Sequence, residues 1–389
     1  MQLIDKIPPM LTDDELIKSL EKYPTYENCK YYSKSKRLIL VQSIFDVYAP
    51  NRMSIELYNS IYFLLIQACK RKEEGLNFHS MNNESILVCG DAGIGKSETI
   101  SRIDEIMFNH QIIELENPYV KVIPILVVQC SLINSFKGFL LSILFAIDSR
   151  IGTNYGSHAN KTNVNTDELL NAVSKALNKH VLILVAEEMN FLTESNKTIS
   201  FANSIVALSN IVNCSIIWVC VPLGLRFFMS SDYLARRALT KVYKQLDYEE
   251  GEKLIKELLK YNYTLKKPDI DGQVIRTIYN SCNGNPSLIK QVVVAAQVWA
   301  INNEYEILSL HSVKHGIKEK LTTMEPYLNN GITISHQRAI EEKTILKAEV
   351  TMDGELVGLF DKAAKSAQKQ VKNVINYIKA YLDVESVEL

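Results

Sequence analysis

The sequence predicts an α/β protein in which a parallel sheet flanked by helices is followed by an all-helical part. Between residues 84 and 221, short and wholly apolar runs alternate with helical patterns, which is typical of strands buried on both faces. A glycine-rich loop joins the first of these runs to the helix after it. Beyond about residue 245 only helical periodicity remains.

Composition narrows the class of protein. The 389 residues carry a net charge of -1 and 47% of them are hydrophobic, so the chain is neither disordered nor basic overall, although a local basic groove stays open. The seven cysteines include no C-x-x-C pair, which favours reduced, mostly buried thiols. The sequence starts without a secretory pattern, and its longest apolar runs are shorter than the roughly 20 residues that span a bilayer. We therefore expect a cytoplasmic protein without membrane contacts.

The elements follow in order along the chain. The first 80 residues are predicted to be helical, with one helix capped by Thr12 and another beginning at Ser54. Helices also separate the predicted strands, one of them capped by Thr166, and the strands are residues 84–90, 122–130, 180–186 and 215–221. Four more helices follow, at residues 248–261, 270–282, 286–301 and 312–321. The predicted division is an N-terminal helical extension (1–80), an α/β core (81–244), a helical part (245–334) and a charged C-terminal tail (335–389).

A phosphate-binding loop follows the first predicted strand. Glycines in such a loop let backbone N–H groups curl around phosphate oxygens, and the helix that begins there adds its positive dipole end. Lys96 is expected to reach the β- and γ-phosphates, and the Ser97 hydroxyl to bind Mg²⁺. The loop fits the pattern G-x-x-x-x-G-K-[ST], and its residues are Gly90, Asp91, Ala92, Gly93, Ile94, Gly95, Lys96 and Ser97.

Two acids at the tip of a buried strand would complete this site. The run HVLILVA leads directly into Glu187 and Glu188, and two carboxylates are costly there unless a metal ion or a water network uses them. We assign Glu187 to the Mg²⁺ sphere and Glu188 to orienting the attacking water. The alternative is that both are solvated acids at the start of a helix, stabilised by its dipole.

Cations farther along the chain are further candidates. Arg236 and Arg237 are expected either to neutralise phosphate charge in a neighbouring subunit or to form a surface pair on a helix. The segment Asn283-Gly284-Asn285-Pro286 predicts a turn before a helix. Lys290 lies one turn into that helix, where it could approach phosphates, and a solvated side chain is the expectation.

Taken in order along residues 32–334, the chain resembles the TnsC-type ATPases of the AAA+ class, with TniB as a more distant relative. These proteins are target-selection regulators of bacterial cut-and-paste transposons. The likeness rests on an ordered set of segments: KSKRLILVQSI, SILVCGDAGIGKSETISRI, QCSLINSFKGFLLSILFAIDSRIGTNYG, LILVAEEMNFLT, LARR, NGNPSLIKQVVVAAQVWAI and EKLTTMEPYLNNGI.

The resemblance implies an AAA+ P-loop core with a helical lid that binds ATP and Mg²⁺ between subunits. It implies a homo-oligomer, a ring or a filament on double-stranded DNA, that links a target selector of the TnsD or TniQ type to transposase subunits. ATP hydrolysis then resets the assembly. Matched residue by residue, Glu187 stands at the Walker B acid, Glu188 at the catalytic glutamate, and Arg236 and Arg237 in the trans-acting arginine region.

DNA contact is expected from loops that line the pore of such a ring. This makes Lys137 the first candidate and Lys121 the second, although both are equally explained as ordinary surface lysines. A near-neutral subunit still holds DNA if each copy offers one or two cations and many copies add up.

Several departures from the family pattern predict an ATPase with slow turnover. Glu187 replaces the usual Asp, Val221 stands where a Thr is expected, and Ser287 stands where a lid Arg is frequent. Gln129 replaces an acid seen in some relatives. Two other functions stay open at this point: an oligomerising signalling or defence-type scaffold that does not bind DNA, and a small-molecule kinase.

Overall fold

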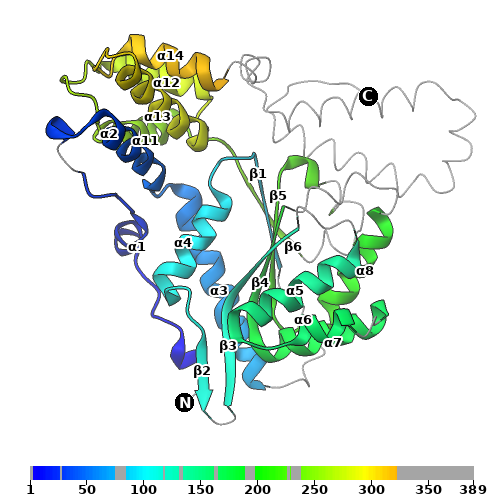
Figure 1. Ribbon diagram of the computed structural model, residues 1–389. Coiled ribbons are helices and arrows are strands. Elements are labelled where there is room, and N and C mark those ends of the chain that lie inside the picture. Colours follow the sequence, from blue (N-terminus) through cyan, green and yellow to red (C-terminus); the bar gives the residue numbers. More distant parts are fainter. Residues whose placement is uncertain are drawn as a thin grey trace, which may run out of the picture.

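The computed structural model describes residues 3–26, 29–74, 85–116, 119–130, 135–161, 165–188, 198–225, 228 and 238–321. Within them, one six-stranded sheet lies between two layers of helices. A helical lid lies beyond the carboxyl ends of the parallel strands (Figure 1). The strands are β1 (Ser85–Gly90), β2 (Ile113–Glu116), β3 (Tyr119–Gln129), β4 (Val181–Glu187), β5 (Ser215–Cys220) and β6 (Ala238–Tyr243).

The sheet order is β2-β3-β4-β5-β1-β6. Five of these strands run parallel, and β2 pairs antiparallel with β3 at one edge. The four apolar runs of the sequence are the central strands β1, β3, β4 and β5, so the predicted α/β fold with a parallel sheet is confirmed. Every residue of β4 and β5 is buried, which explains why those runs are apolar throughout.

Helices cover both faces of this sheet (Figure 1). Strand residues alternate between the two sides, so that Leu87 and Cys89 pack on one face while Ile86 and Val88 pack on the other. The first face is covered by α5 (Phe136–Ile151), α7 (Thr166–His180) and α8 (Thr198–Ile211), with the short α6 (Tyr155–Lys161) against α5. The second face is covered by α1 (Asp13–Leu20), α3 (Arg52–Glu74) and α4 (Lys96–Phe108).

Three predicted helix starts have different outcomes. Thr12 caps α1 as expected, and it forms a reciprocal capping box with Glu15. The cap of α7 is Asn165 and not Thr166, because the Asn165 side chain accepts from the Glu168 amide and Thr166 is already helical. Helix α3 begins at Arg52, two residues before the predicted start at Ser54. The Asn51 side chain accepts from the Ser54 amide, which is how an N-cap holds the third residue of its helix.

The four helices predicted after residue 245 are present and build the lid around a core of their own. None of the helices in the described part of the chain has the length and apolar character needed to cross a bilayer. The predicted charged tail, residues 335–389, lies outside the described residues. The lid helices are α11 (Tyr248–Leu259), α12 (Gly272–Cys282), α13 (Pro286–Asn302) and α14 (Leu310–Leu321).

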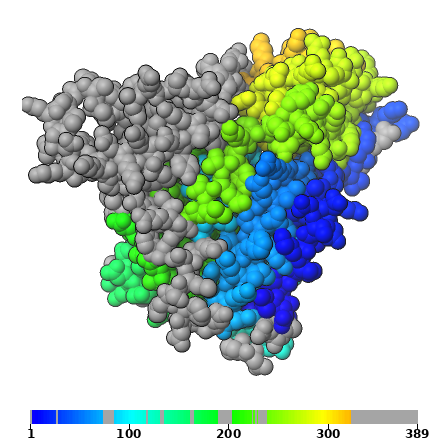
Figure 2. All heavy atoms as spheres, turned by 180° about the vertical axis from the view of Figure 1, so that it is seen from behind, coloured from blue at the N-terminus to red at the C-terminus, as the bar shows by residue number. Residues whose placement is uncertain are grey.

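The N-terminal segment, residues 3–53, contributes to both cores. Leu16 and Leu20 of α1 join the core on the α3 and α4 side of the sheet, where α1 packs against these two helices, whereas Cys29, Val41 and Ile44 pack with the lid. Figure 2 shows this blue segment running along the body of the protein up to the yellow lid. Its remaining elements are the 3-10 turns η1 (Leu3–Lys6), η2 (Cys29–Tyr31) and η3 (Gln42–Asp46) and the helix α2 (Lys34–Val41).

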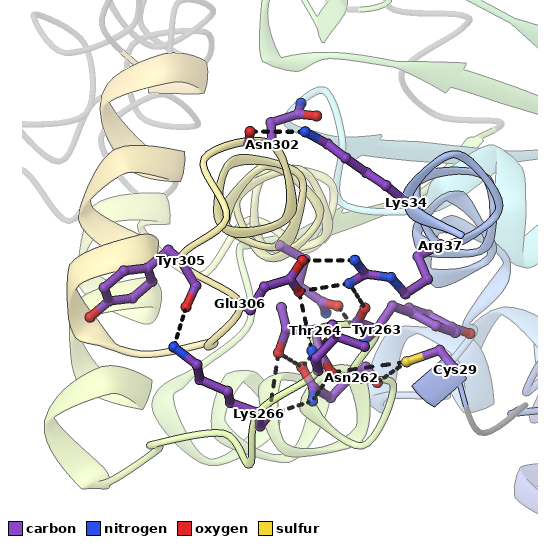
Figure 3. Close-up of polar contacts among 12 residues, drawn as sticks. Cys29, Lys34, Arg37, Asn262, Tyr263, Thr264, Lys266, Asn302, Tyr305 and Glu306 are labelled. Carbon is purple, nitrogen blue, oxygen red and sulfur yellow. Dashed lines mark hydrogen bonds and ion pairs between the residues drawn. The ribbon is translucent and has the colours of Figure 1, made fainter. Parts of the chain in front are cut away.

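A buried ion pair fastens this segment to the lid (Figure 3). Both terminal nitrogens of Arg37 in α2 donate to the carboxylate of Glu306, each over 2.7 Å, and one of them also donates to the Tyr263 carbonyl. Burial alone would raise the pKa of Glu306, yet hydrogen bonds from Arg37 and the Leu265 amide outweigh it and hold the pKa below 4.5. Lys34 adds a bond from its Nζ to the Asn302 carbonyl.

The substitution Glu306→Gln is expected to lower the free energy of unfolding of the lid by about 3 kcal/mol, because it leaves the buried Arg37 charge unpaired. Urea unfolding at neutral pH measures this when it is followed through the fluorescence of Trp299 in α13, with Trp218 of β5 replaced by phenylalanine in both proteins. Because the folded-state pKa of Glu306 is depressed, the difference between the two proteins is full above pH 4.5 and shrinks as the pH falls below it. Glu252→Gln, in the exposed Lys256–Glu252 pair, is the control and should change stability by less than about 0.5 kcal/mol. Equal stability of the Glu306→Gln and wild-type proteins would contradict the assignment.

Candidate nucleotide site

The predicted phosphate loop lies between the end of β1 and the start of α4. Gly93 and Gly95 have positive φ angles of 83° and 96°, a backbone conformation that favours glycine. Helix α4 begins at Lys96, so the free N–H groups of its first turn and its dipole are available to an anion. Ala92, Gly93 and Ser97 are exposed, so the loop opens to solvent on the side where phosphates would enter.

Lys96 is folded against its own loop. Its Nζ donates to the carbonyls of Gly90 and Asp91 over 2.6 and 2.8 Å, and the side chain is buried. Burial lowers the pKa of Lys96 below 10.5, while the negative charges of Asp91 and Glu187, among other groups, oppose that shift. Within the described part of the chain, this ammonium group has two backbone carbonyls and no carboxylate at hydrogen-bonding distance, so it suits phosphate oxygens as further partners.

Glu187 lies at the same end of the sheet as the phosphate loop, where the parallel strands have their carboxyl ends. It ends β4, and because the strands are parallel, this end lies beside the ends of β1, β3 and β5. The strand that carries Glu187, β4, is not the direct neighbour of β1, because β5 lies between them. Glu187 is only 3% exposed and accepts a hydrogen bond from Gln129, its cross-strand neighbour on β3. Because Glu187 is buried, the alternative that it is a solvated acid does not hold. Its carboxylate accepts one side-chain hydrogen bond within the described residues, which leaves lone pairs for a cation.

Glu188 differs from Glu187 in both exposure and backbone. It is exposed and has a φ angle of 57°, which places a non-glycine residue in the left-handed region. That conformation costs a side-chain-bearing residue about 1–2 kcal/mol, and such strain is concentrated at functional sites. The two consecutive acids are therefore separated, with one buried at the sheet edge and the other turned to solvent.

The loop is held from two further sides. Gly90 lies so close to β6 that an added Cβ would stand 2.7 Å from the Tyr243 carbonyl oxygen, and Gln245 donates to the buried Asp91 carboxylate over 2.9 Å. From the lid, Asn285 Nδ2 donates to the Ala92 carbonyl over 2.9 Å, and the Ser287 amide donates to the Gly93 carbonyl over 3.2 Å.

Lys290 is not solvated, which corrects the prediction for this residue. It is 8% exposed, and its Nζ lies 3.2 Å from Glu98 in the first turn of α4 and 3.3 Å from the Phe45 carbonyl. The predicted turn before its helix is present, with Asn283 and Gly284 at positive φ, Asn285 as N-cap and Pro286 in the first turn.

Of the remaining candidates, the structure describes Lys121 and Lys137. Arg236 and Arg237 lie outside the described residues. Lys121 lies near the start of β3, about 26 Å along the strand from Gln129, and opposes Glu114 on β2. Lys137 lies beyond the other end of β3, in the first turn of α5. The two lysines therefore belong to different ends of the core.

Three residues of the site were missed by the sequence reasoning: Gln129 as the partner of Glu187, Gln245 as the partner of Asp91, and Asn285 as a link to the loop. Only Asn285 carried a signal, because Asn before Pro at a helix start predicts a cap. The other two depend on strand pairing that no local pattern reveals.

Known structures share this arrangement of sheet and lid. The structure of the Aeropyrum pernix ORC1 protein in complex with DNA superposes with a TM-score of 0.52 at 15% identity, over 92% of this chain and 85% of that one. The structure of Drosophila ORC bound to DNA gives a TM-score of 0.51 at 12% identity, over 99% of this chain and 86% of that one. Identities this low establish the fold alone, and that fold is AAA+.

Sequence comparison finds a family that resembles part of the chain. No curated protein matches the chain significantly. The family described as "Bacterial TniB protein" matches residues 64–245, which run from within α3 through the phosphate loop and both acids to Gln245. The chain thus has the AAA+ fold, and its residues 64–245 are similar to the bacterial TniB family.

Proposed function

We propose that this protein is an ATP-dependent regulator of bacterial DNA transposition. In this proposal it binds ATP with Mg²⁺, oligomerises as a ring or filament on duplex target DNA, and links a TnsD- or TniQ-like target selector to transposase subunits in the cytoplasm. The observation that carries the proposal is the phosphate loop lying at the same sheet edge as the buried Glu187, within the segment that matches the TniB family.

The site residues divide the work between them in this proposal. The loop amides and Lys96 bind the phosphates, and Ser97 and Glu187 hold Mg²⁺, which supplies charge neutralisation on the phosphate oxygens. Glu188 orients the attacking water, for which its exposed position is suited. Hydrolysis is slow because Val221, directly after β5, and Ser287, at the lid helix, offer no Thr or Arg to the phosphates. ATP then acts as a switch that holds an assembly until hydrolysis releases it.

Arg236 and Arg237 act in trans in this scheme. Both residues lie outside the described part of the chain, and the proposal for them rests on the resemblance of the LARR segment to the trans-acting arginine region of the TnsC-type ATPases.

DNA binding rests on repeated weak contacts. The two ORC structures were determined with DNA, which supports the same class of ligand for this fold. Lys137 is the leading contact residue and Lys121 the second, and residues 335–389 are proposed to dock transposase subunits. Because phosphate contacts carry no sequence information, we expect binding to differ little between DNA sequences.

The proposal predicts that DNA binding requires ATP and is sensitive to salt. Fluorescence anisotropy with a duplex of arbitrary sequence should show binding with a slowly hydrolysed ATP analogue and none with ADP. Affinity should fall at least tenfold between 50 and 200 mM salt, because bound counterions are released. A second duplex of unrelated sequence is the control and should bind equally well. ATP-dependent oligomers that form without retaining DNA would instead support the scaffold alternative.

A further inference from the structure

The lid reaches the phosphate loop at Gly93, one of its exposed residues. Gly93 has no Cβ, and one added there would meet Asn285 Oδ1 at 2.8 Å and Ser287 Cβ at 3.0 Å. Asn285 itself is only 5% exposed. The contact between lid and loop is therefore close-packed, and it involves the two carbonyls described above, those of Ala92 and Gly93.

These two bonds set the direction of two loop amides. In a trans peptide the C=O and the following N–H point in opposite directions. Because the Ala92 carbonyl accepts from Asn285, the N–H of Gly93 points away from the lid. Because the Gly93 carbonyl accepts from the Ser287 amide, the N–H of Ile94 also points away from it. Two consecutive donors of the loop thus point away from the lid.

The Asn285 side chain is itself held in one orientation. Its Oδ1 accepts from the Leu288 amide over 3.2 Å as the cap of α13, which leaves Nδ2 to face Ala92. A second link, between Lys290 and Glu98, holds the same helix against the first turn of α4. The position of α13 relative to the phosphate loop is therefore fixed by contacts with both the loop and α4.

We infer that Asn285 is a positioning residue of the nucleotide site, which acts from the lid by turning the Gly93 and Ile94 amides toward the phosphates. The inference rests on the proposed binding of ATP at this loop. The orientation of the lid and the affinity for phosphate are then coupled. A lid that tilts away breaks its bonds to the loop carbonyls and leaves the Gly93 and Ile94 amides free to turn. By reciprocity, a partner that binds and tilts the lid weakens nucleotide binding by the same factor that nucleotide weakens the partner.

The substitution Asn285→Asp separates this role from helix capping. Aspartate keeps the cap oxygen for Leu288 but replaces the donor to Ala92 with an oxygen. We expect the affinity for Mg·ATP, measured by calorimetry, to fall about tenfold. In the nucleotide-free protein, hydrogen exchange of the peptide spanning residues 90–97 should accelerate. Asn285→Ser retains a capping oxygen without adding charge and should show the same two effects if Asn285→Asp folds poorly.

Asp271→Asn is the matched control. Asp271 caps the lid helix α12 through the Val274 amide, so the variant changes one cap atom in the same lid without touching the loop. It should leave both ATP affinity and loop exchange at wild-type values. Wild-type affinity and exchange in both Asn285 variants would overturn the inference. A wild-type protein that does not bind ATP would defeat the proposed function instead, and faster loop exchange in Asn285→Asp would still support the positioning role.

Discussion

Replacing Lys96 with methionine is expected to abolish ATP-dependent DNA binding. Methionine keeps most of the buried stem but removes the ammonium group that lies among the loop carbonyls of Gly90 and Asp91. Charge-assisted bonds to phosphate are the strongest in such a site, so we expect the affinity for Mg·ATP to fall at least a hundredfold, or about 2.8 kcal/mol. Calorimetry gives the affinity, and anisotropy with labelled duplex gives the consequence for DNA.

Lys72 provides the matched control for that experiment. Its Nζ also donates to two backbone carbonyls, those of Asn178 and Val181, but Val181 starts β4 at the edge of the sheet away from the loop. The substitution Lys72→Met therefore removes a comparable cation that lies at the end of the sheet opposite the phosphate loop. The variant protein should bind ATP and DNA like the wild type. If Lys96→Met binds Mg·ATP within threefold of the wild type, the loop is not the nucleotide site.

Glu188→Gln is expected to retain ATP while losing turnover. A glutamine at this exposed, left-handed position keeps the shape of the side chain but no longer accepts a proton from water. General bases contribute about 10²–10⁴-fold, so phosphate release should slow at least a hundredfold. DNA-bound assemblies should consequently persist after excess unlabelled DNA is added, whereas those of the wild type should dissociate as ATP is consumed.

Glu187→Gln tests the division of roles between the two acids. Because Glu187 is buried and contacts Gln129, its amide variant is expected to raise the Mg²⁺ concentration needed for ATP binding. The Mg²⁺ requirement of Glu188→Gln should equal that of the wild type. Normal hydrolysis by Glu188→Gln would show that another group positions the water.

The sequence predicts the central part of the sheet and misses its edges. Strands β1, β3, β4 and β5 are packed on both faces, so their residues have to be apolar and the runs are visible. Strand β6, with the sequence ALTKVY, is an edge strand with Leu239 63% exposed, and its mixed composition gives no such run. Strand β2 has four residues and pairs antiparallel, and it is equally hard to recognise. Neither strand was predicted.

The phosphate loop is recognisable from sequence because its residues are consecutive. The glycines, Lys96 and Ser97 lie within eight positions, and the chemistry dictates their spacing. The groups that shape the loop come from sequence distances of more than 150 residues, as Gln245 and Asn285 do. Lys290 illustrates the limit, because a lysine on a helix reads as solvated until the pairing of that helix with Glu98 is known.

The N-terminal segment has a consequence for where this protein can be divided. The match to the TniB family begins at residue 64, yet Leu16 and Leu20 belong to the core around α3 and α4, and Val41 and Ile44 to the lid core, far upstream of that boundary. A fragment that began at residue 64 and kept the lid would expose apolar surface both beside α3 and α4 and on the lid. The segment that matches the family is therefore shorter than the segment that has to fold together. An exchange of this region with a similar protein should include the first fifty residues.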